Sequence, residues 1–331
     1  KMTVFDTIRE SCARVSARAR HVRINDFKIP DMGESLSRDP DPGLKTSPCG
    51  GSQGGEGSDP ARTYRGNIKD TVDFVCFLNA ANFGSGYRDE LWREHSLPDT
   101  KRFYSALMGA LDAYVSDHGI PDMSDIVDSD IRLYAEIFDL PPDNQAARNL
   151  LGLFEKSYKD YARFLLDNHN GSAYKLYLSS NKSAQKLVSE LIKIPSYQDI
   201  ATYKSTPVYF YKRAQITAAD LFFALENEEE VFTDINHLTA FADPALPQML
   251  RYYGILEYSD DLSGRIQKGD ELAPGSPEEV EIRAATVQAI EKIKGYHPFW
   301  RVIDIDDILW RRAGTIDLSK FPRHKTKTIF Y

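Results

Sequence analysis

Apolar residues recur at helical spacing along most of this sequence. The longest example is the segment 145–166, QAARNLLGLFEKSYKDYARFLL, which places large side chains every three or four residues. A spacing near 3.6 residues puts such side chains on one face of an α-helix. The segments 69–81 and 183–194 show the same pattern, and 276–294 adds a Ser-Pro start that is typical of a helix N-terminus. We therefore predict a helix over each of these four segments.

Strand-like patterns are few and short in the same sequence. The segments PVYFY (207–211) and KTKTIFY (325–331) are alternating or aromatic enough for short strands. Strands and helices do not alternate along the chain, and there is no internal repeat. The expected fold class is therefore mainly α, a compact helical body with a few short strands.

One segment differs from the rest in composition. Residues 30–66 are rich in Gly, Pro, Ser and Asp and poor in large apolar side chains. Such a segment buries too little surface to offset the entropy that it loses on ordering. We expect a long loop that is mobile at least over 47–60. It would join an N-terminal helical segment, 1–29, to a helical body, 67–331, and we expect these two parts to form one domain.

The overall charge limits the partners of the protein. The 331 residues carry a formal net charge of −8. Duplex nucleic acid requires a basic footprint, so we expect no stable nucleic-acid partner, although a local basic pocket can still hold a small anion.

Three cysteines without metal spacing favour a reducing compartment. No apolar run reaches the ~20 residues that span a membrane, and the first residues lack the apolar core of a signal peptide. We expect a cytoplasmic protein that does not bind membranes, and the sequence does not indicate its oligomeric state.

Two cations stand at the start of an apolar segment. In YFYKRAQ (209–215), Lys212 and Arg213 follow three aromatic residues and precede ITAADLFFAL. One interpretation is that both cations lie at a solvent-exposed edge, with their stems on apolar surface. The other is that they line a helix start facing an anion such as phosphate, where the N–H groups and the positive end of the helix dipole assist.

Asp243 lies in LTAFADPALPQ, directly before Pro244. A residue before proline avoids the α region, and proline suits the first helical position. Asp243 is therefore predicted to cap a helix that runs from Pro244 to about Tyr253. It is either a plain capping aspartate or a fixed anion for a cationic transition state, since backbone N–H donors favour its charged form. Its neighbours Phe241 and Ala242 are apolar and would keep a pocket dry.

Three further segments carry polar candidates. In RVIDIDDILW (301–310), one aspartate can be a helix cap and another can accept from the N–H edge of a guanine-like base. Lys325 and Lys327 would share one face of the predicted C-terminal strand, as a basic cluster or as a solvated tail. In NAANFGSGY (79–87), two glycines flank Ser85, and they either let the backbone approach a ligand or end a helix.

The usual cofactor motifs do not occur in this sequence. It has no P-loop, no GxGxxG after a strand, no HExxH and no GxSxG. Its seven histidines show no ligand spacing. We therefore expect neither a metal nor a cofactor.

Taken together and in order, these segments resemble one known family, the queuosine salvage proteins, which are queuosine 5′-phosphate N-glycosylase/hydrolases. The resemblance covers about 67–331 and is carried by YFYKRAQ, LTAFAD, LRYYGILEYSDDL, EVEIRAATVQA, IDDILW and HKTKTIFY. The sequence departs from the family pattern at two places. After FAD the family commonly has a Tyr-Arg pair, whereas this sequence has Pro244 and Ala245. The segment NFGSGY differs from the more aromatic loop that is common in the family.

The resemblance implies a mainly helical fold similar to DNA glycosylases. It also implies hydrolysis of queuosine 5′-monophosphate to queuine and ribose 5-phosphate, which serves queuine salvage into tRNA. It places the catalytic aspartate at Asp243, which would stabilise an oxocarbenium-like transition state, and a base-contacting carboxylate at Asp306. The candidates for phosphate and ribose are then Lys212, Arg213, Lys325 and Lys327. Further candidates for the base pocket are Phe241, Ala242, Phe232, Asn82 and Ser85.

Two other functions stay open on the sequence. One is a non-catalytic protein that binds a modified purine nucleotide or nucleoside. The other is a DNA glycosylase, which the implied fold suggests and the net charge of −8 argues against.

Overall fold

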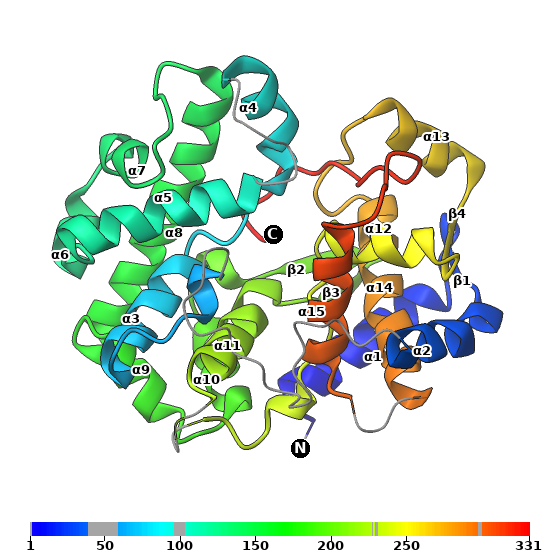
Figure 1. Cartoon of the computed structure of the whole chain (residues 1–331), viewed down its shortest axis with the longest axis horizontal. Coiled ribbons are helices and arrows are strands. Elements are labelled where there is room, and N and C mark those ends of the chain that lie inside the picture. Colours follow the sequence, from blue (N-terminus) through cyan, green and yellow to red (C-terminus); the bar gives the residue numbers. More distant parts are fainter. Residues whose placement is uncertain (1, 39–58, 96–102, 227, 229–230, 297–299) are drawn as a thin grey trace. The chain divides into compact units, whose positions relative to one another are not determined.

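The computed structural model describes residues 2–38, 59–95, 103–226, 228, 231–296 and 300–331 (Figure 1). Helices dominate these residues, and the strands among them form only two antiparallel pairs. The predicted class, mainly α, is confirmed for this part of the chain, whereas a likeness to DNA glycosylases stays a prediction. No helix in these ranges combines the length and the apolar character that a membrane crossing requires.

Contacts within the chain divide it into two compact units, each assembled from separate segments. The first unit comprises 1–50, 199–215 and 236–327, and the second comprises 51–198, 216–235 and 328–331. Helix α11 (Lys212–Ala224) begins in the first unit and continues in the second. The expectation that 1–29 and 67–331 form one domain stays a prediction.

The first unit is organised around one central helix. Its helices are α1 (Val4–Ser16), α2 (Ile29–Arg38), α12 (Ala245–Tyr252), α13 (Asp260–Lys268), α14 (Pro277–Tyr296) and α15 (Val302–Ala313), with the 3-10 turn η1 (Asp26–Lys28). Strand β1 (Val22–Ile24) pairs with β4 (Leu256–Tyr258), and β2 (Ile200–Tyr203) pairs with β3 (Thr206–Tyr209). Helices α1, α2, α12 and α15 all pack against α14. Because α14 is buried on nearly every side, its charged residues Glu279, Glu281 and Arg283 lie inside the unit.

The second unit packs short helices around one long helix. Its helices are α3 (Ile68–Asn79), α4 (Arg88–His95), α5 (Phe103–His118), α6 (Met123–Asp128), α7 (Ile131–Ile137), α8 (Gln145–His169), α9 (Ala173–Ser179) and α10 (Ala184–Leu191). The 3-10 turns are η2 (Pro60–Arg62), η3 (Ser85–Tyr87) and η5 (Pro195–Tyr197), while η6 (Ile235–His237) begins at the unit's edge. Helix α8 contacts α4, α6, α7 and α9. Its Tyr158 ring lies 4.6 Å from the ring of Phe77 and 5.3 Å from that of Tyr134, so its apolar face forms the core.

The four helices predicted from apolar spacing are confirmed as α3, α8, α10 and α14, and the strand at 207–211 as β3. The strand predicted at 325–331 is wrong. Only Lys325 forms an isolated bridge there, with Glu271. Side chains do alternate in burial along this segment, but among the described residues no neighbouring strand continues the pairing beyond that bridge.

The segment 30–66 is not a loop throughout, because α2 covers its first residues and η2 lies near its end. Ile29, Met32 and Leu36 are buried on one side of α2. Their spacing of three and four residues is helical, but the surrounding Gly, Pro, Ser and Asp obscured it. The mobility predicted for residues 47–60 stays a prediction, because residues 47–58 lie outside the described residues.

Candidate functional site

Lys212 and Arg213 are buried at the first turn of α11, with 3% and 1% of their surface exposed. The interpretation that they lie at a solvent-exposed edge is therefore wrong. Tyr211, just before them, has a left-handed backbone with φ of 50°, which is an uncommon and strained conformation for a bulky residue. Asp199 holds this turn, since its carbonyl oxygen accepts from Phe210 N at 3.1 Å and its Oδ2 accepts from Lys212 N at 3.2 Å.

Arg283 on α14 connects this turn to the loop that carries Asp243. Its guanidinium donates two bonds to the Asp199 carboxylate, at 2.9 and 2.5 Å, and its Nε donates to the carbonyl oxygen of Ala242 at 3.0 Å. Glu279 lies 3.4 Å away as a second carboxylate, and the guanidinium stands 3.9 Å over the ring of Phe210. A buried guanidinium needs such partners, so this network fixes both segments against α14.

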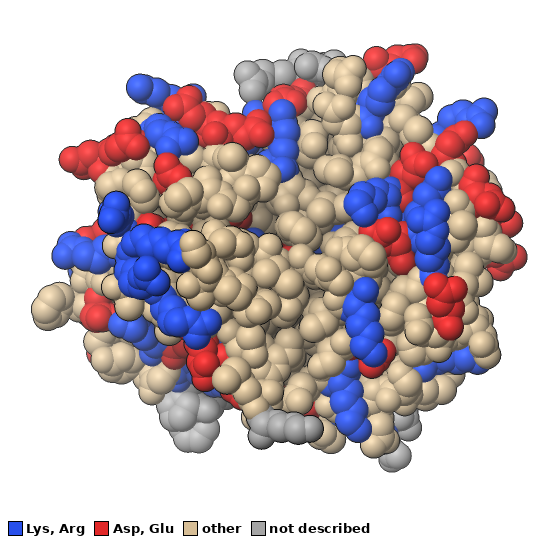
Figure 2. All heavy atoms as spheres, turned by 180° about the vertical axis from the view of Figure 1, so that it is seen from behind, with Lys and Arg blue, Asp and Glu red and all other residues tan. Residues whose placement is uncertain are grey.

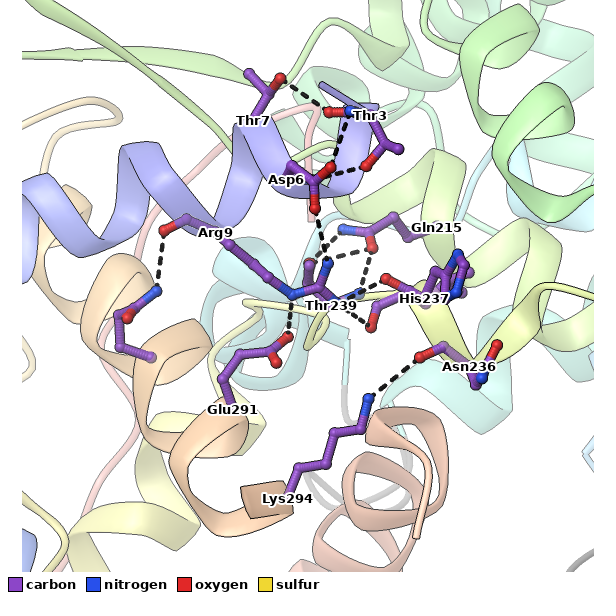
Figure 3. Close-up of polar contacts among 12 residues, drawn as sticks. Thr3, Asp6, Thr7, Arg9, Gln215, Asn236, His237, Thr239, Glu291 and Lys294 are labelled. Carbon is purple, nitrogen blue, oxygen red and sulfur yellow. Dashed lines mark hydrogen bonds and ion pairs between the residues drawn. The ribbon is translucent and has the colours of Figure 1, made fainter. Parts of the chain in front are cut away.

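The segment before Asp243 is held from several helices. Gln215 on α11 accepts from Thr239 N at 2.8 Å and donates to Thr239 Oγ1 at 3.0 Å. Figure 3 shows Arg9 reaching from α1 toward His237, whose carbonyl oxygen accepts at 2.7 Å, and toward Glu291, at 2.9 Å. These contacts leave the backbone before Asp243 little freedom.

Asp243 itself is half-buried, and its Oδ1 accepts from Ala245 N at 2.8 Å. The predicted cap is displaced by one residue, because Pro244 occupies the cap position and α12 begins at Ala245. Asp243 therefore lies one residue before the cap position and accepts a hydrogen bond from the N–H of the first helical residue, Ala245. Among the described residues, no hydrogen-bond donor contacts its other oxygen, Oδ2, which leaves a carboxylate oxygen available to a ligand.

The three aspartates of 301–310 have different roles. Asp304 accepts from Arg301 N at 2.8 Å and so caps α15, as one of them was predicted to do. Asp307 pairs with Arg311 at 3.0 Å. Asp306 is 6% exposed, and its Oδ2 accepts from Phe241 N at 2.9 Å. The base-contacting candidate thus also holds the segment before Asp243.

Lys325 and Lys327 lie on one face of the C-terminal segment, as predicted, and are half-buried. The Lys327 ammonium lies 3.3 Å from Glu271, and the Lys325 carbonyl oxygen accepts from Leu272 N. On the opposite face His324 is buried, and burial lowers its pKa to about 3, with the nearby Arg283 charge acting in the same direction. His324 is therefore a neutral imidazole.

The remaining candidates, Asn82, Ser85 and Phe232, lie in the second unit. Nδ2 of Asn82 donates to Oδ1 of Asn79 at 2.9 Å. Oγ of Ser85 is buried, and no hydrogen-bond partner for it lies within the described residues. Phe232 packs edge-on against Tyr177 with ring centres 5.5 Å apart, which is a core contact.

Gly84, between Asn82 and Ser85, requires the absence of a side chain. It has a left-handed backbone with φ of 100°, and a Cβ atom there would lie 2.6 Å from Cδ1 of Leu150. This combination explains the glycine at that point of the loop.

Sequence reasoning missed the residues that organise the site, chiefly Asp199, Arg283, Gln215 and Arg9. Arg283 offered one signal, as a cation that stands between the apolar residues Ile282 and Ala284 in a predicted helix. Asp199 and Gln215 offered none, since their partners are distant in sequence.

Fold and site together define a mainly helical protein with a buried, charge-rich centre in its first unit. A family model described as queuosine salvage protein matches residues 62–331. The queuosine 5′-phosphate N-glycosylase/hydrolase of Sphaerobacter thermophilus is 31% identical over 272 residues, which cover 78% of this chain and 81% of that protein. The protein of the same name from Bos taurus is 30% identical over 285 residues, covering 81% and 83%. That from Dictyostelium discoideum is 39% identical over 180 residues, covering 52% and 56%. The chain belongs to the queuosine salvage protein family.

Proposed function

We propose that this protein hydrolyses the N-glycosidic bond of queuosine 5′-monophosphate and releases queuine and ribose 5-phosphate. The observation that carries the proposal is membership of the queuosine salvage family over 62–331, because the relatives bear the name queuosine 5′-phosphate N-glycosylase/hydrolase. The released queuine would return to tRNA. Asp243, a carboxylate with one open oxygen on a firmly held segment, supports the chemistry.

Asp243 is proposed to act on the sugar. Queuine is a 7-deazaguanine, so protonation at a purine N7 cannot assist its departure. More of the barrier must then be lowered at the ribose, through an oxocarbenium-like transition state. An ionised carboxylate that is already oriented stabilises such a cation and can align the attacking water.

The phosphate is proposed to lie at the start of α11. Lys212 and Arg213 bring two positive charges to the N-terminal turn of a 13-residue helix, where N–H groups and the helix dipole also favour an anion. Lys325 and Lys327 are further candidates for phosphate or ribose. Binding energy from the phosphate would position the glycosidic bond beside Asp243.

The base is proposed to contact Asp306, Phe241 and Ala242, which all lie in the first unit. For Asn82, Ser85 and Phe232, which lie in the second unit, a contact with the base stays a prediction from the sequence. Asp306 can accept N–H bonds of a guanine-like edge. Phe241 and Ala242, 3% and 1% exposed, would form an apolar wall. Phe232 is the weakest of these candidates because its ring packs against Tyr177.

The test is to incubate the protein with queuosine 5′-monophosphate, and separately with queuosine, and to detect queuine by mass. We expect queuine from the monophosphate and much less from the nucleoside. Asp243→Asn should bind the nucleotide but turn it over at least about 100-fold more slowly. Near-normal turnover in this variant would remove Asp243 from the catalytic role.

Nucleotide binding without any product would favour a non-catalytic binding protein instead. A DNA glycosylase is disfavoured, because the net charge is −8 and Figure 2 shows Asp and Glu beside Lys and Arg at several places on one face. Salt-sensitive binding of duplex DNA would revive that possibility.

A further inference from the structure

The side-chain amide of Gln215 joins two segments of the candidate site within the first unit. Its Oε1 accepts from Thr239 N at 2.8 Å (Figure 3), and its Nε2 donates to the carbonyl oxygen of Phe210 at 2.9 Å. Gln215 and Thr239 are 0% exposed and Phe210 is 1% exposed, so both bonds form away from bulk water. Phe210 lies two residues before Lys212. Thr239 lies four residues before Asp243, so the amide connects the turn that leads into α11 with the segment that leads to the candidate catalytic carboxylate.

The polarity of the two backbone groups fixes the orientation of this amide. A backbone N–H donates, so the oxygen of Gln215 must face Thr239 N. A carbonyl oxygen accepts, so the NH₂ group must face Phe210. The Thr239 hydroxyl lies beside both ends of the amide, 3.1 Å from Oε1 and 3.0 Å from Nε2. Because a buried polar group that loses its partner is costly, the position requires a donor and an acceptor on one side chain of this length.

A second connection runs parallel to the first. Asp199 accepts from the first N–H of α11, and Arg283 bridges Asp199 to the carbonyl oxygen of Ala242. The turn before α11 is therefore joined to the segment before Asp243 at two points, at Thr239 and at Ala242. Two buried attachment points restrict both the position and the direction of that segment, which one point alone does not.

We propose that Gln215 is a positioning residue, which holds the start of α11 and the Asp243 carboxylate at a fixed separation. This inference rests on the proposed function, which places the 5′-phosphate at α11 and the ribose beside Asp243. A nucleotide anchored by its phosphate then presents its glycosidic bond to the carboxylate in one orientation, so part of the phosphate binding energy raises kcat. Without the amide, the phosphate still binds, but the carboxylate is no longer aligned with it.

Gln215→Met keeps the length of the side chain and removes both hydrogen bonds. Lys212 and Arg213 stay in place, so KM for queuosine 5′-monophosphate and the Kd for ribose 5-phosphate should change by less than about threefold, while kcat falls about tenfold or more. Gln215→Asn retains the amide but is one CH₂ group shorter, so it cannot reach Thr239 N and Phe210 together. We expect the same pattern of kcat and KM in this variant.

Tyr203→Phe is the matched control in the same unit. The Tyr203 hydroxyl donates to Glu281 at 2.7 Å, and Tyr203 is 4% exposed. Its loss removes a buried hydrogen bond that belongs to neither connected segment, so kcat should stay within about twofold of the wild type. Comparison of kcat well below the melting temperature of each variant separates a loss of positioning from a loss of stability.

Hydrogen–deuterium exchange measures the connection without turnover. The probe is inorganic phosphate at saturating concentration, and the readout is the exchange of the backbone amides of 239–243. Phosphate should slow this exchange about threefold or more in the wild type and in Tyr203→Phe. It should have little effect on the exchange in Gln215→Met, although phosphate binds to all three proteins.

The outcomes distinguish this inference from the proposed function. Wild-type kcat in folded Gln215→Met would overturn the inference, as would an unchanged kcat with a raised KM, which would assign Gln215 to phosphate binding alone. If Gln215→Met fails to fold, Gln215→Asn decides by the same criteria. Wild-type protein in which phosphate does not slow the exchange of 239–243 would also overturn it. Wild-type protein that shows the phosphate effect but releases no queuine would instead count against the proposed function and support the connection.

Discussion

The buried carboxyl group of Asp220 makes the stability of the protein depend on pH. Its pKa rises from the ordinary 3.8 to about 6 mainly through burial, so folding favours the protonated form. The stabilisation is complete below about pH 4 and is lost as the pH rises through 6. Between about pH 4 and pH 7 we expect the unfolding free energy of the wild type to fall by about 2 kcal/mol relative to Asp220→Asn.

Urea denaturation of both proteins across this pH range measures the effect. Only the difference between the two proteins is informative, because other carboxyl groups titrate in both. A difference that stays constant with pH would contradict the raised pKa of Asp220.

Lys212 allows a test of phosphate recognition by one side chain. If it binds the 5′-phosphate, Lys212→Ala should raise KM for queuosine 5′-monophosphate about tenfold or more. Any turnover of queuosine, which lacks the phosphate, should change little. Lys292→Ala is the control, since Lys292 pairs with Asp26 in an exposed contact. Equal losses with nucleotide and nucleoside would argue against a phosphate role.

At the scale of elements, the ion pair between Asp199 and Arg283 joins the start of β2 to α14. Both side chains are almost wholly buried, at 3% and 2% exposure. Removing one partner leaves an uncompensated charge, so Asp199→Ala should destabilise the protein by about 3–5 kcal/mol. It should also lower activity, because Lys212 N and the carbonyl oxygen of Ala242 are held through this pair.

Asp26→Ala is the matched control for this prediction. It breaks an ion pair with Lys292 whose side chains are 65% and 44% exposed, and the loss should stay within about 1 kcal/mol. Denaturation of both variants gives the comparison. Similar losses in the two would show that burial does not determine the cost of breaking the Asp199 pair.

The elements also show what the sequence could predict. Helices α3, α8, α10 and α14 follow from apolar residues at helical spacing, a local property. Helix α2 obeys the same rule, but three buried residues among many small polar ones gave too weak a signal. The segment 325–331 alternates as a strand does, yet a strand requires a neighbour that no local pattern reveals.

In the candidate site, too, the sequence could predict some features and not others. Asp243 was predictable because proline restricts the residue before it, although the helix begins one residue later than expected. The burial of Lys212 and Arg213 was not predictable, since the same pattern suits an exposed edge. Asp199 and Arg283 are 84 residues apart in sequence, so their pairing exists only in the folded chain.

At the scale of the whole molecule, neither unit is a continuous piece of chain. The second unit takes residues 216–235 from beyond its main segment, and these supply buried partners to it. Asp220 bonds Asn79, Phe232 packs on Tyr177, and Oδ2 of Asp234 accepts from Ser183 Oγ at 2.7 Å. The chain must therefore bring distant segments together before this unit is complete.

A pair of fragments tests this dependence. Fragment 59–198 lacks the partners on 216–235, whereas 59–235 contains them. We expect 59–198 to retain helical far-UV circular dichroism but to lack a cooperative thermal transition, because Asn79 and Tyr177 lose their contacts. Fragment 59–235 should unfold more cooperatively and show a stronger near-UV signal from its packed tyrosines. If 59–198 unfolds as cooperatively as 59–235, residues 216–235 are not an integral part of the second unit, and the contacts of Asp220 and Phe232 contribute little to its stability.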